Sequence, residues 1–260
     1  MGGPPDEHPK RAVPAVRPKR AVPAVRAGPA VPGPGPWPMS ARLVADDPAG
    51  LAAAIEVLRA GGLVGLPTDT VYGIAVALDA PGGIERLFAA KARPPERAIV
   101  VLADALDQVA ELVTLPPEAR VLAAACWPGG LTLVLPIRPG VSLPAALSAG
   151  LPTLGVRVPD HPTPRALARA VGPLPTTSAN RHGEPPALDG AAVLAALGEA
   201  LDLVLDGGPV RGGTSSTVVD CSSGPPRLLR AGAIPADALA AVLDDAGFAH
   251  RLPGEAPPGT

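Results

Sequence analysis

The chain has 260 residues, of which 47% are apolar and 18% charged, and its formal net charge is −2. This length predicts one large domain or a domain with tails, and the apolar fraction is enough for a sizeable core. Two cysteines, Cys126 and Cys221, exclude a disulfide scaffold and give no zinc-ligand spacing, and no apolar run reaches the length of a membrane span. These features together predict a cytoplasmic protein.

Proline and positive charge are concentrated in the first 38 residues. This segment holds eleven prolines and six basic residues against two acidic ones, and the nonapeptide PKRAVPAVR occurs twice, at 9–17 and 18–26. Because proline lacks an N–H donor, the composition predicts a disordered basic tail over 1–38, and it predicts a second tail over 251–260. The folded domain is expected over 40–250. A basic tail of this kind contacts nucleic acid or a membrane surface, or stays solvated without a partner.

Helix and strand patterns alternate from about Ser40. Asp46 or Asp47 can cap a helix that has Pro48 in its first turn and ends at Gly61-Gly62. Further helices are predicted at 81–92, 104–113, 117–126, 162–171, 189–197 and 235–246. Strands are predicted at 63–66, 74–78, 98–102, 131–136, 154–158, 174–175, 201–205, 216–220 and 227–229. Several connections are too short for a helical crossover, so we expect an α+β fold with a mixed parallel and antiparallel sheet covered by helices.

Polar side chains follow the apolar strand at 63–66. The chain continues as Pro67-Thr68-Asp69-Thr70-Val71-Tyr72-Gly73, which places two hydroxyls and a carboxylate in one turn. Side chains at strand ends are often presented to ligands, which makes this turn a candidate site. The alternative is a turn in which these side chains bond only to their own backbone.

Cations cluster after the helix at 81–92. Lys91 and Arg93 stand two residues apart, and Arg97 follows closely. A point charge beside a planar fork suits a polyphosphate, or a carboxylate next to a phosphate. The alternative is a charged helix C-terminus stabilised by the helix dipole.

The later strands carry further polar residues. Arg157 lies in an otherwise apolar strand, on the same face as Thr153, and needs a partner, either Asp160 or an anionic ligand. Ser178 and Asn180 belong to a hydroxyl-rich segment that follows the short strand at 174–175. Such groups bind phosphate or adenine without adding charge, and no Walker loop, catalytic triad or metal-ligand cluster accompanies them.

These segments, in this order, resemble the YrdC-like family, the threonylcarbamoyl-AMP synthases in their short single-domain form. The resemblance runs from about Leu51 to Ile234. It is carried by GGLVGLPTDTVYG at 61–73, KARP at 91–94, WPGGLTLVL at 127–135, TLGVRVPDHP at 153–162, SAN at 178–180, DGG at 206–208, STVVD at 216–220 and LLRAGAI at 228–234.

The resemblance implies a YrdC-like catalytic domain with a large basic cleft. It implies that the substrates are ATP, L-threonine and bicarbonate, with Mg2+ carried by the ATP phosphates. The implied threonine-binding residues are Thr70, Arg157 and Ser216. The implied ATP-binding residues are Lys91, Arg93, Arg97, Thr153, Ser178, Asn180 and Arg230, with Lys91 and Arg93 at the centre of catalysis. The product would pass to a complex that modifies tRNA with a threonylcarbamoyl group.

The chain departs from the family pattern at two positions, and two other functions are open. Leu102 stands where some members carry a histidine near threonine, and Pro186 where some carry a hydroxyl near ATP. One alternative is a module of the same fold that binds double-stranded RNA or tRNA with the cleft and the basic tail. The acidic body and the scarcity of aromatic residues argue against that alternative. The other is a related enzyme that transfers a carbamoyl group to a different acceptor.

Overall fold

The computed structural model describes residues 41–91, 99–181, 183–210 and 212–252. The chain divides into two units, Met1–Ala30 and Val31–Thr260, and all of the described residues belong to the second. The predicted tail over 1–38 lies outside the described residues, as does most of the predicted tail over 251–260. Arg251 and Leu252 are exceptions, because Arg251 bridges to Arg227 and Leu252 is buried, so the folded domain extends two residues past the expected boundary.

The structure confirms the predicted helices to within two residues at each end of each helix. They are α1 (Pro48–Arg59), α2 (Gly83–Ala90), α3 (Leu106–Leu112), α4 (Pro117–Cys126), α6 (Pro162–Val171), α7 (Gly190–Leu197) and α8 (Ala236–Asp245). Their starts follow from local chemistry. The Asp47 carboxylate accepts the Gly50 N–H at 2.8 Å, and the Asp189 carboxylate accepts the Ala192 N–H at 2.7 Å. Both are N-caps that satisfy a backbone donor that the helix leaves free.

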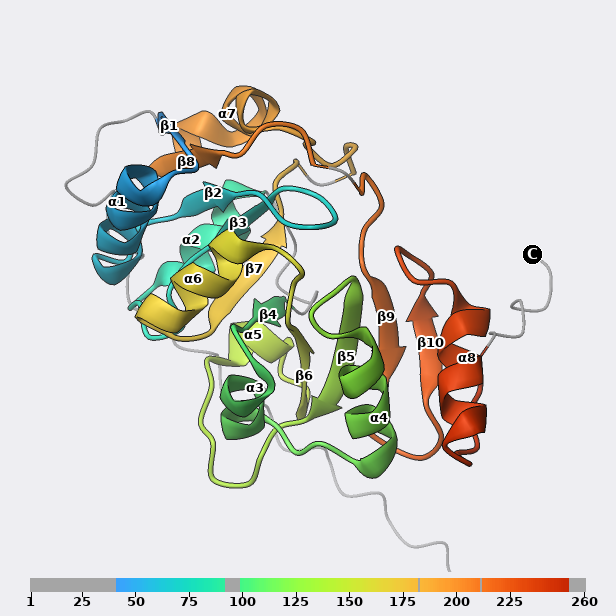
Figure 1. Cartoon of the computed structure of the whole chain (residues 1–260). Coiled ribbons are helices and arrows are strands. Elements are labelled where there is room, and N and C mark those ends of the chain that lie inside the picture. The colour runs from blue at the N-terminus through green and yellow to red at the C-terminus, as the bar shows by residue number, and fades with distance from the viewer. Residues whose placement is uncertain (1–40, 92–98, 182, 211, 253–260) are drawn as a thin grey trace, which may run out of the picture. The chain divides into compact units, whose positions relative to one another are not determined.

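Ten strands form one mixed sheet among the described residues, in the order β1-β8-β2-β3-β7-β4-β6-β5-β9-β10 (Figure 1). They are β1 (Arg42–Ala45), β2 (Val64–Leu66), β3 (Gly73–Ala75), β4 (Val100–Leu102), β5 (Leu131–Pro136), β6 (Thr153–Arg157), β7 (Leu174–Ser178), β8 (Leu203–Asp206), β9 (Thr217–Asp220) and β10 (Arg227–Arg230). The sheet contains parallel pairs such as β4–β6 and antiparallel pairs such as β5–β6, which confirms the predicted mixed sheet.

The structure differs from the expected elements in five places. Strand β3 ends at Ala75 rather than at residue 78, and a 3₁₀ helix at Gly198–Ala200 was not predicted. Strand β1 and the short helix α5 (Ala145–Ser148) were not predicted; β1 is an edge strand whose residues are mostly exposed, so it lacks an apolar pattern. Strand β7 continues to Ser178 rather than ending at residue 175, because its threonines pair with β3. The segment that carries Ser178 is therefore held in the sheet.

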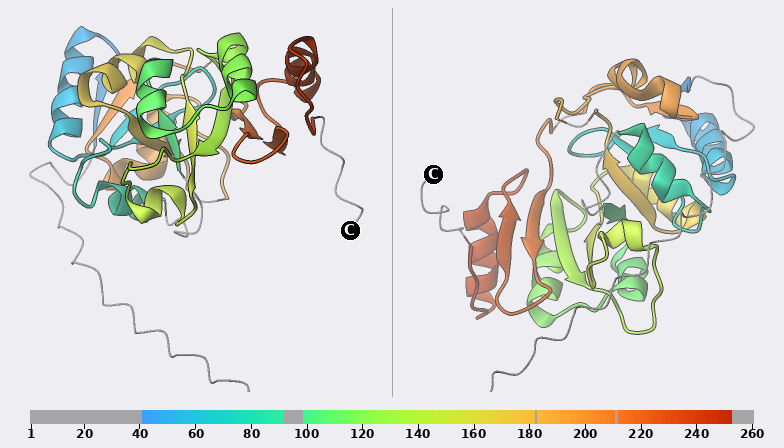
Figure 2. Two further views of the ribbon diagram at one scale, coloured as in Figure 1. Left: turned by 90° about the horizontal axis from the view of Figure 1, so that it is seen from below. Right: turned by 180° about the vertical axis from the view of Figure 1, so that it is seen from behind.

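Helices cover the two halves of the sheet differently. On one face of the sheet, α1 packs against β1, β8 and β2, and α6 packs against β4 and β7, with Leu58 and Leu167 in one apolar cluster. On the other face, α7 packs against β1, β8 and β2, and its Val193 shares a second apolar cluster with Leu87 of α2 (Figure 2). In β5 and β6, alternate residues such as Leu133 and Val156 point into the core. No helix of the described residues meets the length and hydropathy needed to cross a membrane.

A buried ion pair joins α2 to the start of β8. The Asp202 carboxylate accepts from the Leu63 N–H at 2.7 Å and from the Arg86 guanidinium at 3.0 Å, and its side chain is 7% exposed. Removal of the carboxylate would leave the Leu63 N–H without an acceptor. The Arg86 guanidinium would keep the Gly61 carbonyl at 2.9 Å as an acceptor but would lose its counter-charge.

We expect Asp202→Ala to lower the free energy of unfolding by about 3 kcal/mol, because breaking a buried pair leaves its partner uncompensated. Urea unfolding followed by circular dichroism measures the change. Asp79→Ala, at an exposed position, is the control and should change stability by less than about 0.5 kcal/mol. Equal stability of the two variants would show that the Asp202 contacts contribute nothing.

Candidate functional site

A cavity of about 360 Å³ lies over strands β7, β4, β6, β5 and β9, on the face that the core residues of β5 and β6 do not occupy. Strand alternation sends Thr153, Gly155 and Arg157 of β6 to the cavity, and sends Leu154 and Val156 to the core. This confirms the prediction that Thr153 and Arg157 share one face. The floor between them is open because Gly155 has no side chain; an added Cβ would come no closer than 3.7 Å to any neighbour.

Arg157 is the most constrained group in the cavity. It is 5% exposed, and each nitrogen of its guanidinium donates one hydrogen bond. Nε donates to the Gly129 carbonyl at 2.9 Å, Nη1 to Thr70 Oγ1 at 2.9 Å, and Nη2 to Asp69 Oδ1 at 2.5 Å. Burial lowers the pKa of Arg157, and the charge of Asp69 opposes that shift.

The carboxylate partner of Arg157 is Asp69. The prediction that offered Asp160 as one possible partner is wrong. Asp69 comes from the turn after β2, 88 residues earlier in the chain, whereas Asp160 follows β6 directly. The β6 strand directs the Arg157 side chain across the sheet face, toward the turn that carries Asp69 and Thr70. The alternative of a turn bonded only to itself is also wrong, although Thr68 does accept from the Thr70 N–H at 3.1 Å.

Ser216 and Arg230 form a second polar group at the cavity. The Arg230 guanidinium donates to the Ser216 carbonyl at 2.8 Å and to its hydroxyl at 3.1 Å. The hydroxyl of Ser216 also lies 2.8 Å from that of Thr132. Burial lowers the pKa of Arg230, and so does the positive charge of Arg157, which shows that the two cations repel each other within one site.

Lys91 lies at the end of α2 and reaches toward the end of β7. Its Nζ donates to the Ser178 carbonyl at 2.6 Å, the Ser178 hydroxyl at 3.0 Å and Asn180 Oδ1 at 3.2 Å. A helix C-cap does not account for these side-chain contacts, since the acceptors belong to another element. The structure therefore joins the predicted K-x-R and S-x-N motifs through Lys91, which is itself 3% exposed.

The predicted site residues fall into three groups by position. The cavity lining contains Thr70, Thr153, Arg157, Ser178, Ser216 and Arg230. Lys91 and Asn180 contact Ser178 without being part of that lining. Arg93 and Arg97 lie outside the described residues. The described lining carries two guanidinium groups and no carboxylate.

Thr132 is a lining residue that the sequence reasoning missed. It lies on β5, is 1% exposed, and its hydroxyl contacts that of Ser216. A hydroxyl between Leu131 and Leu133 in an apolar strand was the available signal. Trp127, just before this strand, makes a structural contact, because its indole N–H donates to the Leu131 carbonyl at 2.7 Å.

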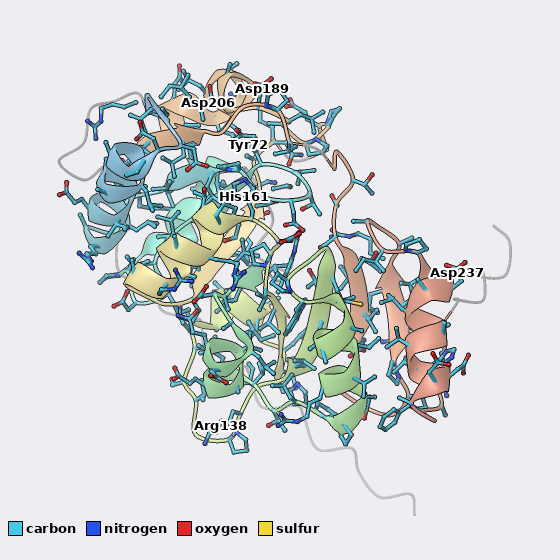
Figure 3. The ribbon with its side chains drawn as sticks, in the orientation of Figure 1. Tyr72, Arg138, His161, Asp189, Asp206 and Asp237 are labelled. Atoms are coloured by element: carbon cyan, nitrogen blue, oxygen red, sulfur yellow. The ribbon has the colours of Figure 1, made fainter. Side chains whose placement is uncertain are left out.

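Tyr72, from the segment at 61–73, contacts the glycines that follow β8. Its hydroxyl donates to the Gly208 carbonyl at 2.8 Å and accepts from the Gly207 N–H at 3.1 Å. Figure 3 shows Tyr72 and Asp206 at the same end of the domain. Burial raises the pKa of Tyr72 to about 12, against the opposing effect of the Gly207 N–H and with a smaller contribution from Asp206.

Because Tyr72 is the single tyrosine, its ionisation can be followed directly. We expect a tyrosinate absorbance midpoint near pH 12 in the folded protein, against 10.0 for an unperturbed phenol. A raised pKa means that the neutral phenol is the form favoured by folding. Its stabilising contribution is complete below the unfolded pKa and is lost as the pH rises through the folded one. Tyr72→Phe should show no titration step, and a native midpoint near 10 would contradict the buried, bonded phenol.

Three comparisons bear on the function. The family model Sua5/YciO/YrdC, described as "Telomere recombination", matches residues 56–232. The chain is 36% identical over 203 residues to the threonylcarbamoyl-AMP synthase of Bacillus subtilis, which covers 77% of this chain and 58% of that protein. It is 37% identical over 195 residues to a putative threonylcarbamoyl-AMP synthase of Mycobacterium tuberculosis, which covers 75% of this chain and 89% of that protein.

A solved structure gives the same fold. The crystal structure of P. abyssi Sua5 complexed with L-threonine superposes with a TM-score of 0.73 at 32% identity, and covers 78% of this chain and 60% of that one. The chain therefore spans about three fifths of the Sua5 protein and of the B. subtilis protein, and most of the M. tuberculosis protein.

Proposed function

The chain belongs to the Sua5/YciO/YrdC family, and on that premise we propose that it forms threonylcarbamoyl-AMP and pyrophosphate from L-threonine, bicarbonate and ATP. The observation that carries the proposal is a single cavity in which two guanidinium groups, Arg157 and Arg230, stand among hydroxyls and no carboxylate lines the wall. Such a site suits two anionic groups that must be brought together despite their repulsion.

The Arg157 end is the proposed site for the amino acid. Three of the five N–H groups of a guanidinium are used by Gly129, Thr70 and Asp69, so each terminal nitrogen keeps one donor. These two donors can take the carboxylate of threonine, and the fixed plane of the fork sets its orientation. Thr70 and Ser216 offer hydroxyls on either side. Leu102, which also lines the cavity, presents an aliphatic side chain where some relatives carry a histidine.

The other end is the proposed site for ATP. Arg230, Thr153 and Ser178 line the cavity. Lys91 donates to Ser178 and to Asn180, and the Asn180 N–H donates to the Ser178 carbonyl. We propose that Arg93 and Arg97, outside the described residues, complete the phosphate contacts. Among the described residues no group of three His, Cys, Asp or Glu side chains lies close enough to hold a metal ion. In this proposal Mg2+ enters with the ATP phosphates as part of the substrate.

The proposed reaction has two steps. The threonine amine and bicarbonate form a carbamate with loss of water, and a carbamate oxygen then attacks the α-phosphorus of ATP. The bond between the α-phosphorus and the bridging oxygen breaks, and pyrophosphate leaves. The protein contributes fixed donors that stabilise the charge on phosphorus and hold the reactants in line, which is the usual mode of catalysis at phosphorus. This makes the enzyme a nucleotidyltransferase.

We further propose that the enzyme is cytoplasmic and that its product passes to a complex that places the threonylcarbamoyl group on tRNA. Purified protein should release pyrophosphate from ATP only when both L-threonine and bicarbonate are present, with magnesium. Release without threonine, or with other amines in its place, would favour the related carbamoyl-transfer enzyme. A folded protein that releases none but binds RNA with strong salt dependence would favour the RNA-binding alternative.

Arg157→Lys tests the proposed carboxylate contact. A lysine keeps the positive charge but lacks the planar fork, so the KM for threonine should rise by about tenfold or more while the KM for ATP changes little. Steady-state pyrophosphate release at varied threonine and ATP measures both constants. Arg138→Lys is the matched control at an exposed position, labelled in Figure 3, and should leave both values unchanged. An unchanged KM for threonine in Arg157→Lys would remove Arg157 from the threonine site.

A further inference from the structure

The two guanidinium groups of the cavity differ in one respect, which is whether a carboxylate neutralises them. Arg157 is paired with Asp69 at 2.5 Å, and the side chains are 6% and 16% exposed. Within the described part of the chain, Arg230 donates only to the carbonyl and hydroxyl of Ser216. Among the ion pairs of the described residues none involves Arg230. One cation is therefore neutralised and the other keeps its charge.

Neutralisation changes what each end attracts. A guanidinium and a carboxylate in contact have no net charge, so they recognise a ligand through directed hydrogen bonds rather than through long-range attraction. The remaining donors of Arg157 still bind a carboxylate, but Asp69 beside them repels a polyphosphate that carries several negative charges. A zwitterionic amino acid, which has no net charge, meets no such penalty. Arg230 attracts the polyphosphate without that opposition.

We propose that Asp69 is a specificity-determining residue, which divides the cavity into a neutral end for a zwitterionic amino acid and a cationic end for a polyphosphate. The proposal rests on the proposed function for the identity of the two ligands. This division keeps the polyphosphate out of the amino-acid end of the cavity. Two free guanidinium groups in one cavity would both bind phosphate, and ATP or pyrophosphate would then occupy the amino-acid end.

Asp69→Asn is the direct test, because it keeps the size of the side chain and removes its charge. Calorimetric titration with inorganic tripolyphosphate, in the absence of threonine, counts the anion sites. We expect one site in the unmodified protein and two in Asp69→Asn, the second at Arg157. In kinetic assays tripolyphosphate should then compete with threonine in the variant alone, and the KM for threonine should rise about tenfold.

Asp160→Asn is the matched control. Asp160 and Asp69 line a second cavity of about 520 Å³ together, but Asp160 makes no contact with Arg157. This variant should keep one tripolyphosphate site. One site in Asp69→Asn as well would overturn the proposal. A second site in both variants would do the same, because any lost negative charge nearby would then suffice.

Arg230→Gln keeps the proposal testable if Asp69→Asn does not fold. Arg230 is an exposed residue of β10 as a whole, although its guanidinium donates to Ser216, so its replacement removes these hydrogen bonds but little apolar packing. We expect tripolyphosphate affinity to fall about tenfold or more while threonine affinity changes less than about threefold. An equal loss of both would show that the two ends are not separate. The anion counts do not depend on activity, so a protein that makes no threonylcarbamoyl-AMP would defeat the proposed function and leave this test standing.

Discussion

The burial of one positive charge determines much of the arrangement around the cavity. Arg157 lies on a strand in the interior of the sheet, where an unpaired guanidinium would be very costly. Its three nitrogens are satisfied by Asp69 and Thr70 from the turn after β2 and by Gly129 from the turn before β5. Two turns that are distant in sequence are thereby fixed against the same side chain. The polar groups around Arg157 lie together because the buried guanidinium needs hydrogen-bond acceptors and a counter-charge.

The other requirement is a sheet face that the apolar core leaves open. Around β8 and β2, residues of helices belong to apolar clusters on both faces of the sheet. Across β6 and β5 the core residues Leu133 and Val156 occupy one face, which leaves the other to Thr132, Gly155 and Arg157. The same alternation that builds the core thus exposes the polar residues to a ligand. Hydroxyls from β7 and from Ser215 and Ser216, which precede β9, complete the wall without adding charge.

Local features of the fold were predictable from the sequence, and long-range pairings were not. Asp47 and Asp189 predict helix N-termini, because an N-cap hydrogen bond forms within one turn of the chain. Apolar runs such as 131–136 predict buried strands. The order of the strands, and Asp69 rather than Asp160 as the partner of Arg157, depend on how distant segments meet. The sequence offered Asp160 or an anionic ligand as the partner, whereas the Arg157 side chain on β6 reaches Asp69. Strand β1 escaped prediction because its stability comes from pairing with β8.

The site was predicted in part for the same reason. The resemblance implied that Thr70, Arg157 and Ser216 bind threonine and that Arg230 binds ATP. The structure places all four at one cavity. Thr132 was overlooked because a hydroxyl within an apolar strand is equally compatible with a buried side chain that bonds to its own backbone. Only its contact with the Ser216 hydroxyl distinguishes the two cases.

Gly155 has a consequence for how this scaffold can change. Gly155 lines the cavity without a side chain, and its neighbours leave room for a Cβ. Exchange of Gly155 for alanine would therefore narrow the cavity without a steric clash. In the proposed site, the space at this position and the charge set by Asp69 belong to different residues, so the two properties can evolve independently.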